Sequence, residues 1–320
     1  MGQILEADSL FSPHMVLQRN KPIKIWGTVK GENPVKVSFM GNTVTAKRKD
    51  QRWEAVLPPA EAARNQELLI TCKEERICIR DVHVGEVWIA GGQSNMEFYL
   101  RYDQDFRQGK RPAFNDDIRF YDVPEICYEG QEQDFDYSRM GFWRRCVPEE
   151  VEYFSAVGYY FAEKLWEDLQ VPVGIIGCNK GGSCTQTWMS REALKAHGQV
   201  WLDDYEREIA SVNYPAYQEA MRKNPRMNMG DPFADSFAEE TLYGIGAKRQ
   251  RELMEQLASA MEGQPMLHYD NRPGCYYEYM LKKIAGVQAR GVTWYQGESE
   301  VYHPECYYEL FQDMVAFWRS

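Results

Sequence analysis

The sequence predicts an α/β protein in which an α/β domain follows a small β-sandwich domain. Up to residue 83 the chain carries several short strand-type segments at close spacing, which is typical of a small sandwich. From residue 84 onward apolar strand-type runs alternate with helix-type stretches, which indicates α/β organisation. A chain of 320 residues is long enough for about two domains. We therefore expect a β-sandwich domain at residues 1–83 and an α/β domain at residues 84–320.

Short strands account for the first domain. One of them alternates apolar and polar residues over positions 35–39, as expected for a strand with one buried face. The turn pair Gly41-Asn42 then starts the following strand. The predicted strands of this domain lie at residues 23–27, 35–39, 43–45 and 68–71.

The second domain is expected to start with a strand at residues 86–90. Residues 156–169 read as a helix that packs one face on the sheet, and the next strand follows at 173–177. The apolar positions of this helix are Val157, Tyr160, Phe161, Leu165 and Leu169. A further strand lies at 291–295. The polar, helix-type stretch at about 201–265 is expected to be an insertion between two strands.

Charge and hydropathy exclude two classes of partner. Thirty-seven basic against 48 acidic residues give a net charge of −11, which disfavours nucleic acid and anionic membrane surfaces. No apolar run reaches the roughly 18 residues that a membrane span needs. The first residues lack the basic and apolar regions of a signal peptide. As written, the chain is expected to be cytoplasmic, or extracellular or periplasmic if a signal peptide has been removed.

The eight cysteines show no metal-binding spacing. No Cys-x-x-Cys pair is present, so we predict no metal site and no cofactor of this kind. Free buried thiols are the default expectation for such a chain. Cys72 and Cys78 flank a predicted turn and are the one pair that could form a disulfide.

A glycine pair and a serine follow the first strand of the second domain. Gly91 and Gly92 allow a sharp turn, so that Ser94 lies at the carboxyl end of a strand, where open α/β sheets build their sites. The alternative is that Ser94 only caps the next helix. The motif is not the G-x-S-x-G elbow, because Met96 replaces the final glycine.

A second glycine pair follows the strand at 173–177. The backbone N–H groups of Gly181 and Gly182 could face a developing oxyanion, close a tight loop or hold a phosphate. Against a phosphate, the P-loop spacing is absent because Lys180 precedes the glycine pair.

An amide and a carboxylate follow the strand at 291–295. Gln296 can donate an N–H to an oxyanion. Glu298 is expected to orient the loop backbone rather than to act as a base.

Taken together in this order, these segments resemble the sialate O-acetylesterase family of SGNH-type serine esterases. The resemblance covers nearly the whole chain, and chance does not supply this many ordered blocks. The resembling segments lie at residues 10–12, 15–19, 25–27, 84–88, 92–97, 154–161, 181–183, 188–190 and 294–299.

The resemblance implies a three-layer, flavodoxin-like SGNH domain that removes O-acetyl groups from carbohydrates. It implies an acyl-enzyme on Ser94 and, as first candidate substrate, 9-O-acetylated sialic acid. The implied oxyanion donors are the backbone N–H of Ser94, an N–H of Gly181 or Gly182, and the side chain of Gln296. Residues implied to support the site loops are Gln93, Asn95 and Glu298.

The sequence departs from the family at the catalytic base. The family carries its Asp and His in a late D-x-x-H block, and this chain ends before such a block. Of the five histidines only His303 closely follows a site loop, so it is the one weak candidate for a substitute base. A serine without a base is a poor nucleophile. We therefore expect the chain alone to be nearly inactive, to leave an open sheet edge, and to need a complementing C-terminal segment or a second copy.

Two other functions stay open from the sequence. The same chemistry would serve an acetylxylan esterase or another sugar esterase. With 20 Tyr and 9 Trp the chain could instead be a non-catalytic sugar-binding module. In each case the expected partner is an acetylated sugar, and neither cofactor nor metal is expected.

Overall fold

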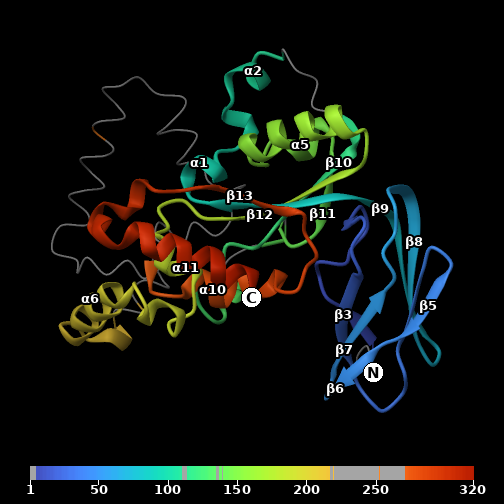
Figure 1. Ribbon diagram of the computed structural model, residues 1–320, viewed down its shortest axis with the longest axis horizontal. Coiled ribbons are helices and arrows are strands. Elements are labelled where there is room, and N and C mark those ends of the chain that lie inside the picture. The colour runs from blue at the N-terminus through green and yellow to red at the C-terminus, as the bar shows by residue number, and fades with distance from the viewer. Residues whose placement is uncertain are drawn as a thin grey trace. The chain divides into compact units, whose positions relative to one another are not determined.

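The computed structural model describes residues 5–109, 114–134, 137–138, 140–216, 219, 252 and 271–320. The chain divides into two compact units. Unit 1 takes its residues from 1–123, 140–180 and 283–295, and unit 2 from 124–139, 181–282 and 296–320. All strands of the described residues lie in unit 1, and the described part of unit 2 is helical. Figure 1 shows the elements with their labels.

An antiparallel sheet of four strands begins unit 1, in the order β1-β3-β7-β6. Its strands are β1 (Leu5–Ala7), β3 (Ile23–Val29), β6 (Lys47–Lys49) and β7 (Arg52–Leu57). Strand β7 alternates exposed and buried side chains, with Trp53, Ala55 and Leu57 buried. This period of two fixes which face of the sheet meets the core.

A second, nine-stranded sheet has the order β11-β10-β12-β9-β8-β4-β5, with β2 and β13 also paired to β9. Its strands are β2 (Val16–Gln18), β4 (Lys36–Phe39), β5 (Asn42–Thr45), β8 (Ala63–Cys72), β9 (Glu75–Gly92), β10 (Asn115–Asp122), β11 (Trp143–Cys146), β12 (Val173–Asn179) and β13 (Gly291–Tyr295). The strands predicted at 23–27, 35–39, 43–45, 68–71, 86–90, 173–177 and 291–295 are all confirmed as strands.

Strand β9 connects two kinds of sheet. Its first part pairs antiparallel with β8, and its last part pairs parallel with β12 and β13. It runs through residues 83 and 84 without interruption. The domain boundary proposed there stays a prediction, and the structure adds that one strand crosses it.

Helices of unit 1 cover the parallel part of this sheet. They are α1 (Ser94–Glu97), η1 (Leu100–Tyr102), α2 (Gln104–Arg107), α4 (Pro148–Val151) and α5 (Ala156–Leu169). Figure 1 shows α1 and α5 on the same side of the β9–β12 strands. The Ser155 hydroxyl accepts the Gly158 N–H (3.0 Å) and caps α5, which ends at a left-handed Gln170.

The predicted span of α5 is confirmed, but its predicted inward face is only half-buried. Small residues and one tyrosine are fully buried instead, namely Ala156, Gly158, Tyr159 and Ala162. Val157 and Leu165 pack at the margin, and Leu169 is 40% exposed. Small side chains let the helix approach the sheet closely, which a count of large apolar residues cannot detect.

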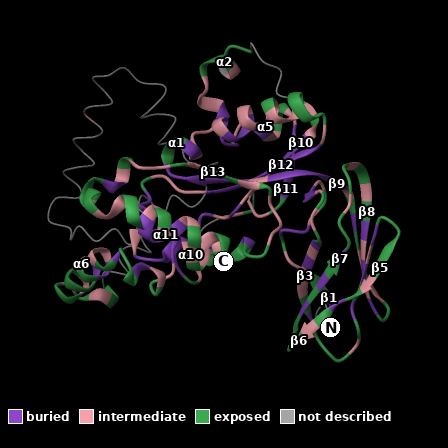
Figure 2. Cartoon of the chain, in the orientation of Figure 1, coloured by how far each residue is buried: buried purple, intermediate pink, exposed green. Residues whose placement is uncertain are grey.

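One hydrophobic cluster of unit 1 lies between α5 and the parallel strands. Phe120 and Phe154 stack there with their ring centroids 4.5 Å apart, beside Ile175 of β12. Figure 2 shows that β12 is buried along nearly its whole length, as expected for a central parallel strand.

Unit 2 is held together around Trp188. The ring centroids of Trp188 and Tyr276 are 5.0 Å apart, and the Trp188 carbonyl accepts the indole N–H of Trp318 at 3.0 Å. The helices that the structure describes in this unit are α3 (Gln131–Asp134), η2 (Thr185–Trp188), η3 (Ala193–Lys195), α6 (Gln199–Ala210), α10 (Cys275–Tyr279), η7 (Glu298–Tyr302), η8 (Pro304–Cys306) and α11 (Tyr307–Arg319). Helix η6 (Leu281–Ile284) connects unit 2 to unit 1. Leu310 and Met314 form the buried stripe of α11.

The suggested Cys72–Cys78 disulfide is wrong. Neither cysteine forms a disulfide in the structure. In the β8–β9 ladder Cys72 lies opposite Glu75 and Cys78 lies opposite Leu69, so the two cysteines are out of register. One is buried and the other exposed, which rules out a bridge without a shift of the strands.

The predicted polar insertion at 201–265 is described only at its start. Helix α6 covers residues 199–210, and most of the remainder lies outside the described residues. Among the helices that the structure does describe, none has the length and apolar character to cross a bilayer.

Candidate active site

The backbone of the turn before Ser94 contacts the ends of two neighbouring strands, β13 and β12. Gly92 closes β9 with φ +141°, and a Cβ there would lie 2.1 Å from the Tyr295 carbonyl oxygen of β13. Only glycine permits this close approach. On the other side the Gly92 carbonyl accepts the Lys180 N–H, which follows β12, at 3.0 Å. The turn therefore lies at the carboxyl edge of three parallel strands.

Gln93 supports the turn through its backbone. It is 3% exposed, and its N–H donates to the Tyr295 carbonyl at 3.0 Å. Its own carbonyl accepts the N–H groups of Met96 (2.8 Å) and Glu97 (3.0 Å), which starts α1. These contacts hold the turn, and the role of Gln93 in supporting an active-site loop stays a prediction.

Ser94 is presented at the surface. It is exposed and is the first residue of α1, whose N-cap is Gln93, with no side-chain capping bond. The alternative that Ser94 serves as a helix cap is therefore wrong. Its hydroxyl has no hydrogen-bond partner among the described residues. The neighbouring Asn95 is exposed as well.

Two ionisable groups near this edge of unit 1 are neutralised or inert. Asp122, at the end of β10, is partly buried, and burial raises its pKa while the paired Arg144 guanidinium opposes that rise. Burial also raises the pKa of the Cys178 thiol at the end of β12, which suppresses the thiolate form. Neither group is a competing nucleophile.

The histidines of unit 1 lie far from Ser94 along β9. His14 Nδ1 pairs with Asp81 Oδ2 at 2.6 Å, and His83 is itself a residue of β9. At about 3.3 Å per residue, roughly 30 Å of strand separates these positions from the turn before Ser94. Neither His14 nor His83 is therefore a base for Ser94.

The second glycine pair opens the described part of unit 2 after Lys180. Gly181 is half-exposed and Gly182 is exposed. The Gly182 carbonyl accepts the Asn271 side-chain amide at 3.3 Å. Ser183 is buried, and its hydroxyl accepts the indole N–H of Trp188 at 3.0 Å. The loop is thus anchored on both sides of its exposed glycine.

Gln296 has a hydrogen-bond partner on every side of its amide. Its Nε2 donates to Glu300 Oε1 at 2.7 Å and to the Ser183 carbonyl at 3.2 Å. Its Oε1 accepts from the Tyr307 hydroxyl at 3.3 Å, and the Thr185 Oγ1 also lies 3.3 Å from it. This amide therefore joins the loop after β13 to the loop that carries the second glycine pair.

The carboxylate that contacts Gln296 is Glu300, which the sequence reasoning did not single out. Glu298, which it did, is exposed. Glu300 is 3% exposed, and its Oε1 also accepts the N–H (2.6 Å) and hydroxyl (2.9 Å) of Thr185. Glu300 follows Glu298 by two residues and is the buried residue of η7. The spacing of residues in this short, irregular loop does not indicate which of the two glutamates is buried.

Both ring nitrogens of His303 lie within hydrogen-bond distance of carboxylates. Its Nε2 lies 2.7 Å from Asp204 Oδ2, and its Nδ1 lies 3.3 Å from Glu305 Oε1. A general base needs one nitrogen free to accept a proton. In this arrangement His303 fastens η7 and η8 to α6 rather than serving as a base.

A second histidine of unit 2 has an oriented ring. His197 Nδ1 lies 2.7 Å from Asp313 Oδ2 of α11, and the side chain is half-exposed. Sequence patterns could not predict this pair, because 116 residues separate its members. His268 lies outside the described residues.

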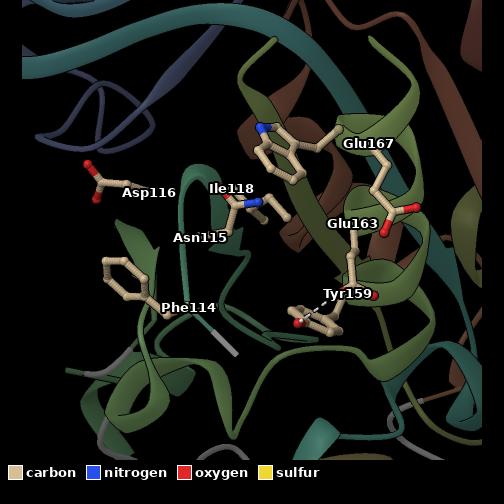
Figure 3. A pocket seen from close by; sticks show the side chains of 8 residues that line it. Phe114, Asn115, Asp116, Ile118, Tyr159, Glu163 and Glu167 are labelled. Atoms are coloured by element: carbon tan, nitrogen blue, oxygen red, sulfur yellow. Dashed lines mark hydrogen bonds between the residues drawn. The ribbon is translucent and has the colours of Figure 1, made fainter. Parts of the chain in front are cut away.

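A hollow of about 340 Å³ lies at the opposite edge of the parallel strands (Figure 3). It is bounded by the start of β10 and by α5, so within unit 1 it is remote from Ser94. Figure 3 shows Tyr159 turned to Glu163 on the α5 side and Phe114 across from them. Among the described residues no group of three or more His, Cys, Asp or Glu could hold a metal ion.

No family model matches this sequence. The chain is 25% identical over 333 aligned residues to the sialate O-acetylesterase of Rattus norvegicus, covering 98% of this chain and 55% of the relative. Against the human sialate O-acetylesterase, identity is 23% over 331 residues, again with 98% of this chain. The chain thus spans about half the length of the curated relatives it matches.

A similar fold is found in a solved structure. The crystal structure of a novel carbohydrate acetylesterase from Xanthomonas citri superposes with a TM-score of 0.69 at 24% identity, and the match covers 98% of this chain and 56% of that one. At this identity the likeness concerns the fold.

Proposed function

We propose that this chain, a relative of the sialate O-acetylesterases, carries the nucleophile and oxyanion loops of a carbohydrate O-acetylesterase. The reaction is hydrolysis of an O-acetyl group on a sugar, with 9-O-acetylated sialic acid as the first substrate to test. No metal or organic cofactor enters this proposal, because ester hydrolysis through a serine needs none.

The observation that carries the proposal is the placement of Ser94. The sequence matches sialate O-acetylesterases over 98% of its length. In the structure Ser94 is exposed directly after the turn of Gly92 and Gln93, at the carboxyl ends of β9, β12 and β13. Open α/β sheets bind and transform ligands at that edge.

The proposed chemistry assigns a role to each group. The Ser94 hydroxyl attacks the acetyl carbonyl carbon, the sugar oxygen leaves with a proton, and water then releases acetate from the acyl-enzyme. The carbonyl oxygen becomes negative in the intermediate. We propose the backbone N–H of Ser94, an N–H of Gly181 or Gly182, and the Gln296 amide as its donors.

Two finer points of architecture belong to the same proposal. We propose that the parallel strands β10, β12, β9 and β13 are the SGNH-type sheet of the enzyme. We also propose that the strands of residues 5–83 form a β-sandwich domain. The strand order and the Xanthomonas citri structure support both points.

The test is acetate release from 9-O-acetylated sialic acid and from an acetylated xylooligosaccharide, with the intact mass recorded for the same preparation. Ser94→Ala should lower turnover by about 10⁴- to 10⁶-fold, as loss of a serine nucleophile does. The matched control is Ser190→Ala, which removes a hydroxyl of unit 2 that serves a local turn through the Ala193 N–H. Release that survives in Ser94→Ala would refute the nucleophile assignment.

A second comparison asks whether the chain is sufficient. We expect slow release from the 320-residue chain and faster release when a second chain that carries a D-x-x-H block is co-expressed with it. The expectation rests on His303, both of whose nitrogens face carboxylates, and on the distance of His14 and His83 from Ser94. Full activity at the 320-residue mass would contradict it and make His197 and His268 the next residues to replace.

A further inference from the structure

We propose that Glu300 is a positioning residue that locks the Gln296 amide in one orientation, so that its second N–H, which donates to the Ser183 carbonyl, can change partner to an oxyanion. This inference rests on the proposed function, since it concerns how one of the oxyanion donors is held. It assigns a role to a buried carboxylate that the reaction chemistry above does not use.

Glu300 is a buried carboxylate whose contacts all fall on one oxygen. Its Oε1 accepts the N–H and hydroxyl of Thr185 and the amide of Gln296, at 2.6, 2.9 and 2.7 Å. Its Oε2 is buried and has no hydrogen-bond partner among the described residues. Burying a carboxylate is costly unless its hydrogen bonds are good, so this arrangement indicates a fixed and specific role.

The contact with Glu300 decides which way the Gln296 amide points. A carboxylate only accepts hydrogen bonds, and so does the Ser183 carbonyl. The NH₂ group of Gln296 must therefore face Glu300 and Ser183, and its oxygen must face the other way. A half-turn of the amide would place its oxygen against two acceptors and is disfavoured.

Two hydroxyls lie next to the amide oxygen of Gln296. Thr185 Oγ1 and Tyr307 Oη each lie 3.3 Å from Gln296 Oε1. Burial, with the nearby Glu300 and Glu298 carboxylates, raises the pKa of Tyr307 and keeps its phenol protonated as a donor. A hydroxyl can also accept a hydrogen bond, so these two side chains would tolerate either orientation of the Gln296 amide. Only the acceptors Glu300 and Ser183 determine its orientation.

One N–H of the amide can change its partner to an oxyanion. The bond to Glu300 is short and charge-assisted at 2.7 Å, whereas the bond to the Ser183 carbonyl is 3.2 Å long. The longer bond is the weaker one and is the one to be exchanged when a negative oxygen forms. Glu300 thus holds the amide while the second N–H changes partner.

The kinetic test is a double-substitution cycle of Glu300 and Gln296. Removing one oxyanion donor costs roughly 10²–10³ in kcat, so we expect about a 100-fold lower kcat for Gln296→Ala and for Glu300→Ala, with KM nearly unchanged. Because Glu300 acts through Gln296, the double variant should be no slower than Gln296→Ala. Glu300→Gln keeps an acceptor and should recover kcat to within about tenfold of the parent.

The matched control is Thr187→Val. It removes a buried hydrogen bond of the same segment, from Thr187 Oγ1 to the Cys184 carbonyl at 2.7 Å, with no contact to Gln296. It should lower thermal stability without lowering kcat. If Glu300→Ala and Gln296→Ala multiply their effects in the double variant, Glu300 is structural only and the proposal is overturned.

A second readout needs no activity. In ¹⁵N spectra the side-chain amide of Gln296, identified by its loss in Gln296→Ala, should exchange slowly with water in the parent and at least tenfold faster in Glu300→Ala. Unchanged exchange overturns the orienting role. Fast exchange in the variant, together with no acetate release from any protein, supports the orienting role of Glu300 and refutes the esterase proposal alone.

Discussion

His83 is a buried histidine held in its neutral form. It is 1% exposed, and its Nδ1 accepts the Asn65 N–H at 3.2 Å. Its Nε2 lies near the Asp116 carbonyl and 3.2 Å from the Arg119 guanidinium. Burial, and then the Arg119 charge, lower the pKa of His83. Protonation would remove the acceptor for Asn65 and add a cation beside Arg119.

This histidine should make stability fall with acid. An unfolded histidine titrates near pH 6.5, above the lowered pKa of folded His83. Below about pH 6.5 the unfolded chain therefore binds a proton that the folded chain does not, so the free energy of unfolding falls by up to roughly 1.4 kcal/mol per pH unit. Chemical unfolding between pH 7 and 5 measures this slope.

His83→Gln keeps an acceptor for Asn65 but cannot titrate, so its slope over this window should be shallower than that of the parent. His197→Gln, which replaces a half-exposed histidine, is the control and should leave the His83 contribution to the slope in place. Equal slopes for the parent and His83→Gln would contradict the prediction.

At the scale of the element, the end of β9 is where backbone geometry controls the candidate nucleophile. β9 and β13 approach so closely at Gly92 that a Cβ would meet Tyr295 oxygen at 2.1 Å. The same turn presents Ser94. Gly92 therefore affects both the packing of β9 on β13 and the position of Ser94.

Gly92→Ala should separate these strands and displace Ser94. The left-handed conformation costs an alanine roughly 1–2 kcal/mol, and forcing an atom into the contact adds about 1–3 kcal/mol. Gly41→Ala is the matched control, since Gly41 also has a positive φ but nothing within 4 Å of its Cβ position. Equal losses of unfolding free energy in both variants would show that the Tyr295 contact carries no strain.

At the scale of the whole molecule, β13 lies at an edge of the sheet. Among the described strands it pairs with β9 alone, and Val292 and Tyr295 are 41% and 47% exposed. An edge strand offers unpaired N–H and C=O groups to another chain. The open edge expected from the sequence is present in the described part of the chain.

We expect the 320-residue chain to associate through β13 as its concentration rises, which light scattering after size exclusion would detect. Val292→Lys should shift the population to monomer, because a charged side chain on an edge strand opposes pairing. Val56→Lys is the control, since Val56 is 45% exposed on β7, which belongs to the other sheet. A monomer at all concentrations, or equal effects of both variants, would contradict this prediction.

The strands and α5 could be predicted because local pattern decides them. Alternation at residues 35–39, helical spacing at 156–169 and turns such as Gly41-Asn42 reflect the side chains' own periodicity and the backbone's steric limits. The positions of Ser94 and Gln296 after strands followed in the same way. Both are properties of segments a few residues long.

Only the tertiary structure decided which groups meet. The sequence determined that a serine follows β9 and that a polar loop follows β13. That Glu300 rather than Glu298 holds Gln296, and that Asp204 takes a nitrogen of His303, depends on contacts between segments far apart in the chain or on how an irregular loop turns. Hydrogen bonds are short-ranged and directional, so such partners are fixed by three-dimensional packing and leave no periodic signal in the sequence.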